Sequence, residues 1–266
     1  MGMELELGGR VAVVTGASKG IGLAVVRTLA AEGMHVVAAS RTSSPDFPAD
    51  VLHVPVDLME PGAPAEVIAR AVSAFGGLDV LVNNAGGPPP GATLPRLGFL
   101  TPDDDDWRAM FEFNLFAAVR AVRAAIPAML ERGGGSIVNV SSTAARQAAA
   151  MNIDYSAAKA ALNYVGKSVS EEYGPQGIRV NTVSPGATLT DWWTKPGGAA
   201  EVLSGVTGAG ADAVVKQVAP EMMRLSTGRL VHPQEIADVV ALLASPRSGS
   251  TTGADYAVDG GYLKEL

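Results

Sequence analysis

Tyr155 and Lys159 occur four residues apart in the stretch "YSAAK", in a segment expected to be helical, so their side chains share one helix face. The phenol of free tyrosine has a pKa near ~10, which is too high for an efficient base near neutral pH. An ammonium group nearby favours the phenolate and lowers that pKa. The pair therefore suits proton transfer at a carbonyl oxygen, although an unrelated pair on a helix surface would look the same.

Ser142 ends the predicted strand that precedes this helix. Its hydroxyl could hydrogen-bond the substrate oxygen and orient that oxygen for Tyr155. Ser141 is adjacent, but neighbouring side chains of a strand point to opposite faces. Only one of the two serines can therefore reach the site.

A glycine-rich turn, "TGASKGIG", joins the first predicted strand to the first predicted helix. Gly16, Gly20 and Gly22 allow a sharp turn, and the free N–H groups of a helix N-terminus suit a pyrophosphate. The alternative is that the glycines serve packing alone. Their spacing lacks the Gly-Lys-Ser/Thr of a nucleotide triphosphate loop, which disfavours ATP or GTP hydrolysis.

Short apolar runs alternate with helix-like segments along the whole chain, which predicts a doubly wound α/β fold of one domain spanning residues 1–266. Because the runs are apolar on both faces, we expect a Rossmann-like parallel sheet of seven strands covered by helices. The predicted strands are 11–15, 35–40, 51–57, 78–83, 136–142, 178–184 and 255–260, and the predicted helices are 21–33, 64–75, 105–131, 155–173 and 233–244.

Three connections stand out. Residues 87–104 and 190–228 look irregular and are too long for plain connections, so we expect substrate loops or a lid there. The stretch between the second and third strands contains two prolines and two aspartates, so we expect a loop in place of a helix.

Composition excludes several classes of site and partner. The chain has no cysteine and only three scattered histidines, so we expect no metal site. A net charge of −7 argues against nucleic acid and anionic membranes as partners. The acidic start is unlike a signal peptide and no long unbroken apolar run suggests a transmembrane helix, so we expect a cytoplasmic protein.

Six motifs together resemble the short-chain dehydrogenase/reductase family, and the likeness extends over roughly residues 8 to 262. Among the members of that family, the chain is most similar to reductases of the 3-oxoacyl or small-ketone type. The resemblance implies hydride transfer between a nicotinamide cofactor and a carbonyl or carbinol carbon. The motifs are "TGASKGIG" (15–22), "NNAG" (83–86), Asn114, "SS" (141–142), "YSAAK" (155–159) and "SPGATLT" (184–190).

The resemblance also assigns roles. Tyr155 is the acid/base, Ser142 rather than Ser141 holds the substrate oxygen, and Lys159 tunes Tyr155 and binds ribose. Asn114 would hold a water in a proton relay, where its alternative is a tolerated polar residue facing a neighbouring carbonyl. The implied cofactor-binding residues are Gly16, Ser18, Lys19, Gly20, Ile21, Gly22, Arg41, Asp57, Leu58, Asn84, Ala85, Gly86, Tyr155, Lys159, Pro185, Gly186, Thr188 and Thr190.

The second predicted strand ends in Ser40 and Arg41 instead of an acid that would hold the adenosine ribose. Nothing at position 40 repels a 2′-phosphate, and Arg41 can pair with one through two parallel N–H bonds. By resemblance Lys19 lies near the same phosphate and Asp57 near the adenine, although Asp57 could also cap the segment that follows. NADP(H) is therefore expected over NAD(H), with a solvated Arg41 as the alternative.

The predicted substrate cleft lies above Tyr155, between residues 87–101 and 191–225. Its lining is mostly apolar and favours a neutral, hydrophobic ketone or alcohol over a small charged acid. The acids at 103–106 are expected to cap a helix, with a divalent cation as the alternative. The lining candidates are Pro88, Pro89, Pro90, Leu94, Leu97, Phe99, Trp192, Trp193, Met222 and Met223, with Arg96, Lys195 and Arg224 as sparse basic neighbours.

Two other functions remain open at this stage: a cofactor-binding regulatory or scaffold protein without turnover, and an NAD-dependent alcohol dehydrogenase of the same family. An epimerase or dehydratase of the longer related type is disfavoured by the short chain and the glycine spacing. The C-terminal segment resembles the family's last strand and tail, which implies a homotetramer or homodimer.

Overall fold

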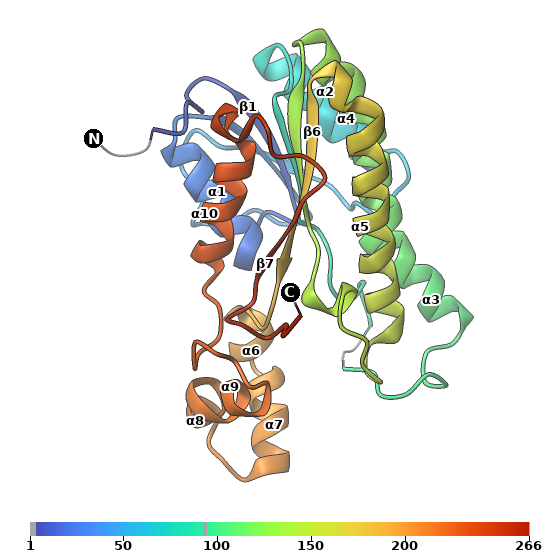
Figure 1. The fold of residues 1–266 in the computed structure, drawn as a ribbon, viewed down its shortest axis with the longest axis vertical. Coiled ribbons are helices and arrows are strands. Elements are labelled where there is room, and N and C mark those ends of the chain that lie inside the picture. The colour runs from blue at the N-terminus through green and yellow to red at the C-terminus, as the bar shows by residue number, and fades with distance from the viewer. Residues whose placement is uncertain (1–3, 93–94, 266) are drawn as a thin grey trace.

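A seven-stranded, fully parallel sheet forms the centre of the molecule, as the strand pattern predicts (Figure 1). The computed structural model describes residues 4–92 and 95–265. The strand order β3-β2-β1-β4-β5-β6-β7 reverses direction between β1 and β4, where open α/β sheets bind their ligands. The strands are β1 (Val11–Thr15), β2 (His35–Ser40), β3 (Leu52–Pro55), β4 (Val80–Asn83), β5 (Gly135–Val140), β6 (Ile178–Pro185) and β7 (Asp255–Val258).

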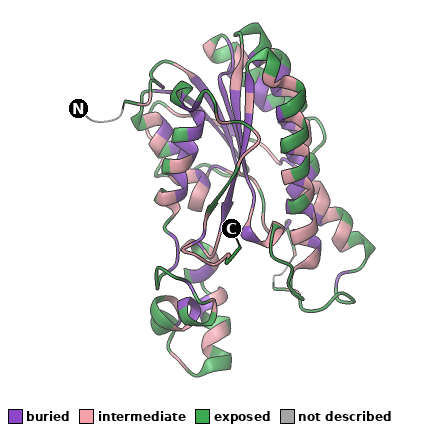
Figure 2. Ribbon diagram, in the orientation of Figure 1, coloured by how far each residue is buried: buried purple, intermediate pink, exposed green. Residues whose placement is uncertain are grey.

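Helices cover both faces of the sheet and bury its apolar side chains (Figure 2). On one face lie α1 (Gly20–Ala31) and α10 (Pro233–Ala244). On the other lie α2 (Ala63–Phe75), α4 (Ala117–Glu131) and α5 (Ile153–Tyr173). The sheet is therefore sealed along most of its length, and chemistry is confined to the loops at its ends.

The long helix predicted at 105–131 is interrupted. It consists of α3 (Asp104–Phe111), a π-helical turn η1 (Glu112–Phe116) and α4. π-turns inside α-helices occur mostly at functional sites, and Asn114 lies in this one. Asp103 caps α3 through the N–H groups of Asp105 and Asp106, which confirms the capping interpretation of the acidic run.

By length and composition alone, Asp104–Glu131 could cross a membrane, with a mean hydropathy of 1.4 in its most apolar window. In the fold, the apolar face of α4 packs on the sheet through Val122, Ala125, Ile126 and Met129. Core packing therefore accounts for the apolar character of this helix.

The 190–228 segment is not the irregular connection that the sequence predicted. It folds into short helices beside the carboxyl end of the sheet (Figure 1). Its core is a separate cluster that includes Trp193, Val214 and Leu225. The helices are α6 (Asp191–Thr194), α7 (Ala199–Thr207), α8 (Ala211–Ala213), η4 (Val214–Val218) and α9 (Ala219–Met222).

The other two connections agree with the expectation for the residues described. Residues 41–51 contain no helix, so β2 and β3 are joined by a loop. The 87–104 loop has no regular element before α3 in its described part, and Leu94 lies outside the described residues.

Candidate active site

Ser142 and Tyr155 meet at the carboxyl end of the sheet. Ser142 follows β5 and precedes the short helix η2 (Thr143–Ala145), while Tyr155 lies in the first turn of α5. The Ser142 hydroxyl lies beside the Tyr155 phenol, whose pKa it lowers. The Ser141 hydroxyl points elsewhere, because it donates to the Lys159 carbonyl at 3.4 Å in the buried interior. Of the two serines, Ser142 is therefore the one beside the phenol.

Lys159 is only 2 % exposed, and burial lowers the pKa of its ammonium to about 8. Its Nζ donates to the Val140 carbonyl at 3.0 Å and lies 5.9 Å from the centre of the Tyr155 ring. Burial also raises the pKa of the Tyr155 phenol, and the neighbouring Ser142 hydroxyl offsets only part of that rise. The expected net lowering of the tyrosine pKa is therefore wrong for this arrangement, because desolvation by burial has the largest effect on the phenol.

Asn114 is buried, and its side chain hydrogen-bonds to the backbone of Gly87. Its Oδ1 accepts from the Gly87 N–H at 2.8 Å, and its Nδ2 donates to the Gly87 carbonyl at 2.9 Å. Gly86 fits between Asn114 and Lys159, because a Cβ there would lie 2.9 Å from Asn114 Oδ1 and 2.7 Å from Lys159 Nζ. The π-turn thus places Asn114 beside Lys159, next to the residues that follow β4.

The glycine turn packs closely against the "NNAG" segment. Gly16 has φ +64°, and a Cβ there would lie 2.7 Å from the Ala85 Cα. At Gly22 a Cβ would lie 2.2 Å from the Gly16 carbonyl oxygen. Packing alone therefore demands glycine at two positions of the motif, whatever the turn binds.

Thr15, which is not among the predicted site residues, joins the glycine turn to the end of β4. Its hydroxyl accepts from the backbone N–H groups of Asn84 and Ala85, both at 3.0 Å. Asn84 in turn donates through Nδ2 to the carbonyls of Thr15 and Gly16, at 2.9 and 3.0 Å. Its position at the head of the first motif was the only signal for this role.

At the end of β2, the Ser40 side chain is buried and Arg41 is exposed. Ser40 Oγ donates to the Thr42 carbonyl at 2.8 Å, and His53 Nε2 lies 3.2 Å from both Ser40 Oγ and the Ser40 carbonyl oxygen. Since the serine hydroxyl proton is already used, the histidine N–H is the donor to Ser40. His53, absent from the predicted site, therefore fixes the turn that carries Arg41.

The remaining predicted cofactor residues also lie at the carboxyl end of the sheet. Asp57 accepts from the Met59 N–H at 3.0 Å, so it caps a local turn and not α2, which begins later. Thr190 lies beside the glycine turn, with its Cγ2 3.2 Å from where a Gly20 Cβ would be. Thr188 donates to the Gly186 carbonyl at 3.0 Å in the loop after β6. The other members of the set, Ser18, Lys19, Ile21, Leu58 and Pro185, lie in these same segments.

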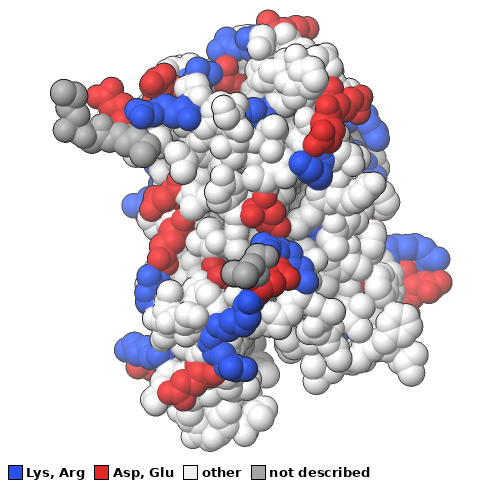
Figure 3. All heavy atoms as spheres, viewed as in Figure 1, with Lys and Arg blue, Asp and Glu red and all other residues white. Residues whose placement is uncertain are grey.

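Two residues of the C-terminal tail contact segments on two sides of this site. Glu265 pairs with Arg146, just beyond η2, at 2.8 Å from Nη2. Lys264 Nζ donates to the Arg224 carbonyl and the Ser226 hydroxyl, at 3.0 and 3.1 Å. Figure 3 shows charged side chains of both signs scattered over this face of the molecule. These contacts had no local sequence signal.

The candidate substrate lining divides by burial. Trp193 is 4 % exposed and belongs to the core of the 190–228 segment, so it fills that core. Trp192 is half-buried at the edge of the same cluster, and Met222 is exposed. The Arg96 guanidinium is taken up by two carboxylates of this chain.

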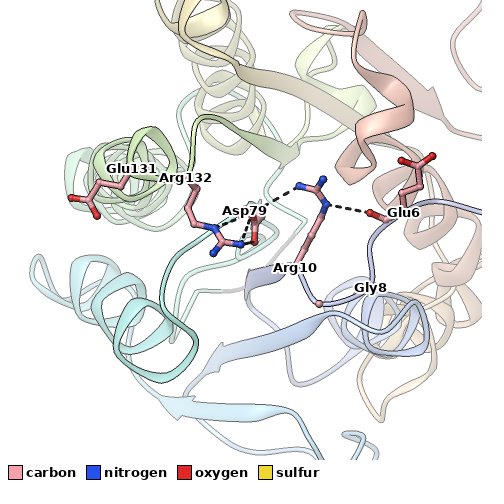
Figure 4. A pocket seen from close by; sticks show the side chains of 7 residues that line it. Glu6, Gly8, Arg10, Asp79, Glu131 and Arg132 are labelled. Carbon is pink, nitrogen blue, oxygen red and sulfur yellow. Dashed lines mark hydrogen bonds and ion pairs between the residues drawn. The ribbon is translucent and has the colours of Figure 1, made fainter.

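A cavity of about 670 Å³ lies at the opposite end of the sheet (Figure 4). Its centre is Asp79, which accepts from the Val11 N–H at 2.8 Å and pairs with Arg132 at 3.1 Å. Arg10 Nη1 lies 3.9 Å from the same carboxylate. These ion pairs join the ends of β1, β4 and α4. The charged residues that line the cavity therefore have a structural role, away from Tyr155.

A family model for short chain dehydrogenases matches residues 10–197. The chain belongs to the short-chain dehydrogenase family. Members of this family are oxidoreductases that use a nicotinamide cofactor, which agrees with the resemblance seen in the motifs.

Known members of the short-chain dehydrogenase family match nearly the whole chain. A 3-alpha-(or 20-beta)-hydroxysteroid dehydrogenase of Mycobacterium bovis is 32% identical, over 99% of this chain and 93% of that protein. A cis-4-hydroxycyclohexanecarboxylate dehydrogenase of Sinomonas cyclohexanicum is 37% identical, over 95% and 96%. The crystal structure of L-sorbose reductase from Gluconobacter frateurii, complexed with NADPH and L-sorbose, has a TM-score of 0.87 at 34% identity, over 99% of this chain and 100% of that one.

Proposed function

We propose that this chain is an NADP(H)-dependent oxidoreductase that interconverts a ketone and a secondary alcohol, acting mainly as a carbonyl reductase. The observation that carries the proposal is the grouping of Ser142, Tyr155, Lys159 and Asn114 at the carboxyl end of the sheet. Ser142 lies beside the phenol and lowers its pKa, and Gly86 lies between Asn114 and Lys159. A regulatory or scaffold protein would have no need of this arrangement.

Each side chain has a defined task in this proposal. Nicotinamide supplies the hydride when NADPH is bound. The Ser142 hydroxyl holds the substrate oxygen, and Tyr155 gives that oxygen a proton during reduction. Because burial raises the pKa of Tyr155, its phenol stays protonated at neutral pH, which suits its use as an acid. Lys159 binds ribose hydroxyls, and Asn114 supports a proton relay toward Lys159.

The glycine turn fits a dinucleotide. In the described part of the chain, α1 begins with no side-chain cap at Lys19 and no acid in its first turn. The positive end of its dipole and its first N–H groups are thus left for a pyrophosphate. We infer that the cofactor contacts are those of the set predicted from the motifs, from Gly16 to Thr190.

The residues at the end of β2 favour NADP(H) over NAD(H) as the cofactor. Ser40 is buried and neutral, and Arg41 is exposed beside it, where a ribose 2′-phosphate would be bound. The NADPH complex of L-sorbose reductase, a relative by structure, supports the same preference.

The substrate we propose is a hydrophobic ketone or a 3-oxoacyl-type compound. Leu97 and Phe99 are 68% and 65% exposed in the 87–104 loop, and Met222 is 61% exposed in the 190–228 segment. Arg96 is neutralised by this chain's own carboxylates, so it offers little to an acidic substrate. The hydroxysteroid dehydrogenase among the relatives supports a bulky apolar alcohol, whereas the cyclohexanecarboxylate enzyme is named for an acid.

The test is a panel of ketones, 3-oxoacyl thioesters, sugars and hydroxy acids, assayed in both directions with NADPH and NADH by nicotinamide absorbance. We expect turnover with NADPH and a bulky neutral ketone. Binding of NADPH without turnover on any member would favour the scaffold function. Preference for NADH or for a small carboxylate would contradict the cofactor or the substrate proposal separately.

A further inference from the structure

The 87–104 loop is bonded to the residues just before Tyr155. Leu97 and Met151 form an isolated antiparallel bridge, and the Gly98 N–H donates to the Ala150 carbonyl at 3.0 Å. Within this contact, Arg96 is the loop residue that lies nearest to α5. The loop therefore runs alongside the entry to the helix that carries the phenol and is held to it by main-chain hydrogen bonds.

Asn152, at the start of α5, hydrogen-bonds to this loop. Its Oδ1 accepts from the Arg96 N–H at 2.7 Å, and its own N–H donates to the Arg96 carbonyl at 2.8 Å. As the N-cap residue of α5 it has φ +53° and makes no side-chain cap. Asparagine is well suited to the left-handed region. The ordinary capping role of this side chain is thus replaced by a bond to another segment.

The Arg96 side chain completes the connection through a buried ion pair. Its Nη1 lies 2.5 Å from Asp154 Oδ2, and its Nη2 lies 2.7 Å from Asp106 Oδ1 at the start of α3. The Asp154 side chain is fully buried, and its other oxygen accepts from the Tyr155 N–H at 2.9 Å. One carboxylate thus holds the loop with one oxygen and the backbone of Tyr155 with the other.

We propose that Arg96 is a positioning residue for Tyr155, acting through Asp154 and Asn152. A buried carboxylate requires a counter-charge, and a guanidinium that bridges two carboxylates fixes their geometry. The 87–104 loop therefore fixes the position of the first turn of α5. The placement of the Tyr155 phenol beside Ser142 depends on that loop. This inference rests on the proposed function, since positioning matters only if Tyr155 transfers a proton.

The test compares four variants with the parent enzyme. Arg96→Gln removes the charge and leaves Asp154 buried without its partner, so the fold itself will lose stability. The double variant Arg96→Gln/Asp154→Asn restores charge balance and keeps an acceptor for the Tyr155 N–H. Arg96→Lys keeps the charge but lacks the planar fork for two carboxylates. Arg108→Gln is the matched control, because Arg108 pairs with Asp104 and Asp105 at the same helix start but on the exposed surface.

We expect Arg96→Gln and the double variant to lower kcat by roughly 10- to 100-fold, the cost of a small displacement of a reacting group. Their NADPH dissociation constants should change far less than kcat, because most of the proposed cofactor residues lie on other segments, in the glycine turn and after β2 and β6. The melting temperature of the double variant should exceed that of Arg96→Gln while its kcat stays low. Arg96→Lys should recover part of kcat, and Arg108→Gln should match the parent.

Recovery of parental kcat together with stability in the double variant would show that the pair only stabilises the fold, and would overturn the proposal. So would parental kcat in Arg96→Gln. If the parent enzyme reduces no carbonyl in the panel, the proposed function fails, and amide hydrogen exchange then tests the contact itself. Exchange at the Tyr155 amide should be faster in the double variant but not in Arg108→Gln, and unchanged exchange in both would also overturn the proposal.

Discussion

The Lys159 ammonium lies 5.9 Å from the centre of the Tyr155 ring and donates its hydrogen bond to the Val140 carbonyl. The two groups are neighbours in a desolvated site, and each is driven toward its neutral form. Burial lowers the pKa of Lys159 from 10.5 to about 8 and raises the pKa of Tyr155 above 10.0. The pair therefore favours a protonated phenol at neutral pH.

The first prediction concerns stability against pH. Below about pH 8, Lys159 is charged in both the folded and the unfolded chain, so the cost of burying its charge is fully present. Between about pH 8 and 10.5 the unfolded chain binds more protons, so this contribution makes the free energy of unfolding rise with pH. The whole effect corresponds to roughly 3 kcal/mol.

The measurement is urea unfolding of the parent and of Lys159→Met, each without cofactor, from pH 7 to pH 10.5. The difference between the free energies of unfolding of the two proteins removes the contributions of the other lysines and tyrosines. The variant should gain most relative to the parent at the low end of this range, and the gap should narrow as pH rises. A gap that does not depend on pH would contradict the buried ammonium.

Tyr155→Phe should abolish most turnover without affecting the fold. The substitution removes one hydroxyl, and a proton transfer of this kind contributes roughly 10²–10⁴-fold to the rate. NADPH binding, followed by fluorescence, should stay near the parental value. In the parent, alcohol oxidation should accelerate toward alkaline pH, because it needs the phenolate of a tyrosine whose pKa is raised. Activity within a few-fold of the parent would exclude Tyr155 as the proton donor.

Arg41→Ala should weaken NADPH binding by roughly 1.5–3 kcal/mol, the scale of a hydrogen bond to a charged group. NADH binding should be almost unchanged, because NADH has no 2′-phosphate. Arg70→Ala, an exposed arginine on α2, is the control for a general loss of positive charge. The assignment of Arg41 fails if both cofactors lose affinity equally.

The two adjacent tryptophans should respond differently to alanine. Trp193→Ala removes the largest buried side chain of the 190–228 core and should destabilise that segment by about 3–5 kcal/mol. Trp192→Ala, at a half-buried position, should lower kcat/KM for a bulky ketone with the NADPH dissociation constant unchanged. Steady-state kinetics and thermal unfolding distinguish the two effects. The apolar cleft is wrong if neither substitution changes kcat/KM.

The strands and the shared helix face of Tyr155 and Lys159 were accessible from the sequence for a common reason. Strands sealed on both faces must be apolar throughout, so runs such as Val11–Thr15 are visible without knowledge of their partners. The spacing of Tyr155 and Lys159 is likewise a local property of one helix. Local patterns therefore predicted the strands and this helix pair, whereas the choice of Ser142 over Ser141 came only from the resemblance to the family.

The contacts that the sequence could not predict join residues far apart in the chain. Arg96 meets Asp154, Arg146 meets Glu265 and His53 meets Ser40, and no local pattern distinguishes these charged or polar residues from solvated ones. The helices of the 190–228 segment were missed for another reason. Alanine favours helix as strongly as glycine opposes it, and the packing around Trp193 and Val214 decides between them.

The last prediction concerns assembly. β7 lies at the edge of the sheet, and three of its four residues are exposed, including Tyr256 at 39%. An exposed edge strand is a ready surface for a second copy, and the resemblance of the C-terminal segment to the family's last strand supports a dimer or tetramer. Light scattering at micromolar concentration should give a mass of two or four chains. Tyr256→Asp should lower that mass, whereas Val206→Asp, at an exposed apolar position in α7, should not. A monomer for the parent would contradict assembly altogether, and an unchanged mass for Tyr256→Asp would place the interface away from β7.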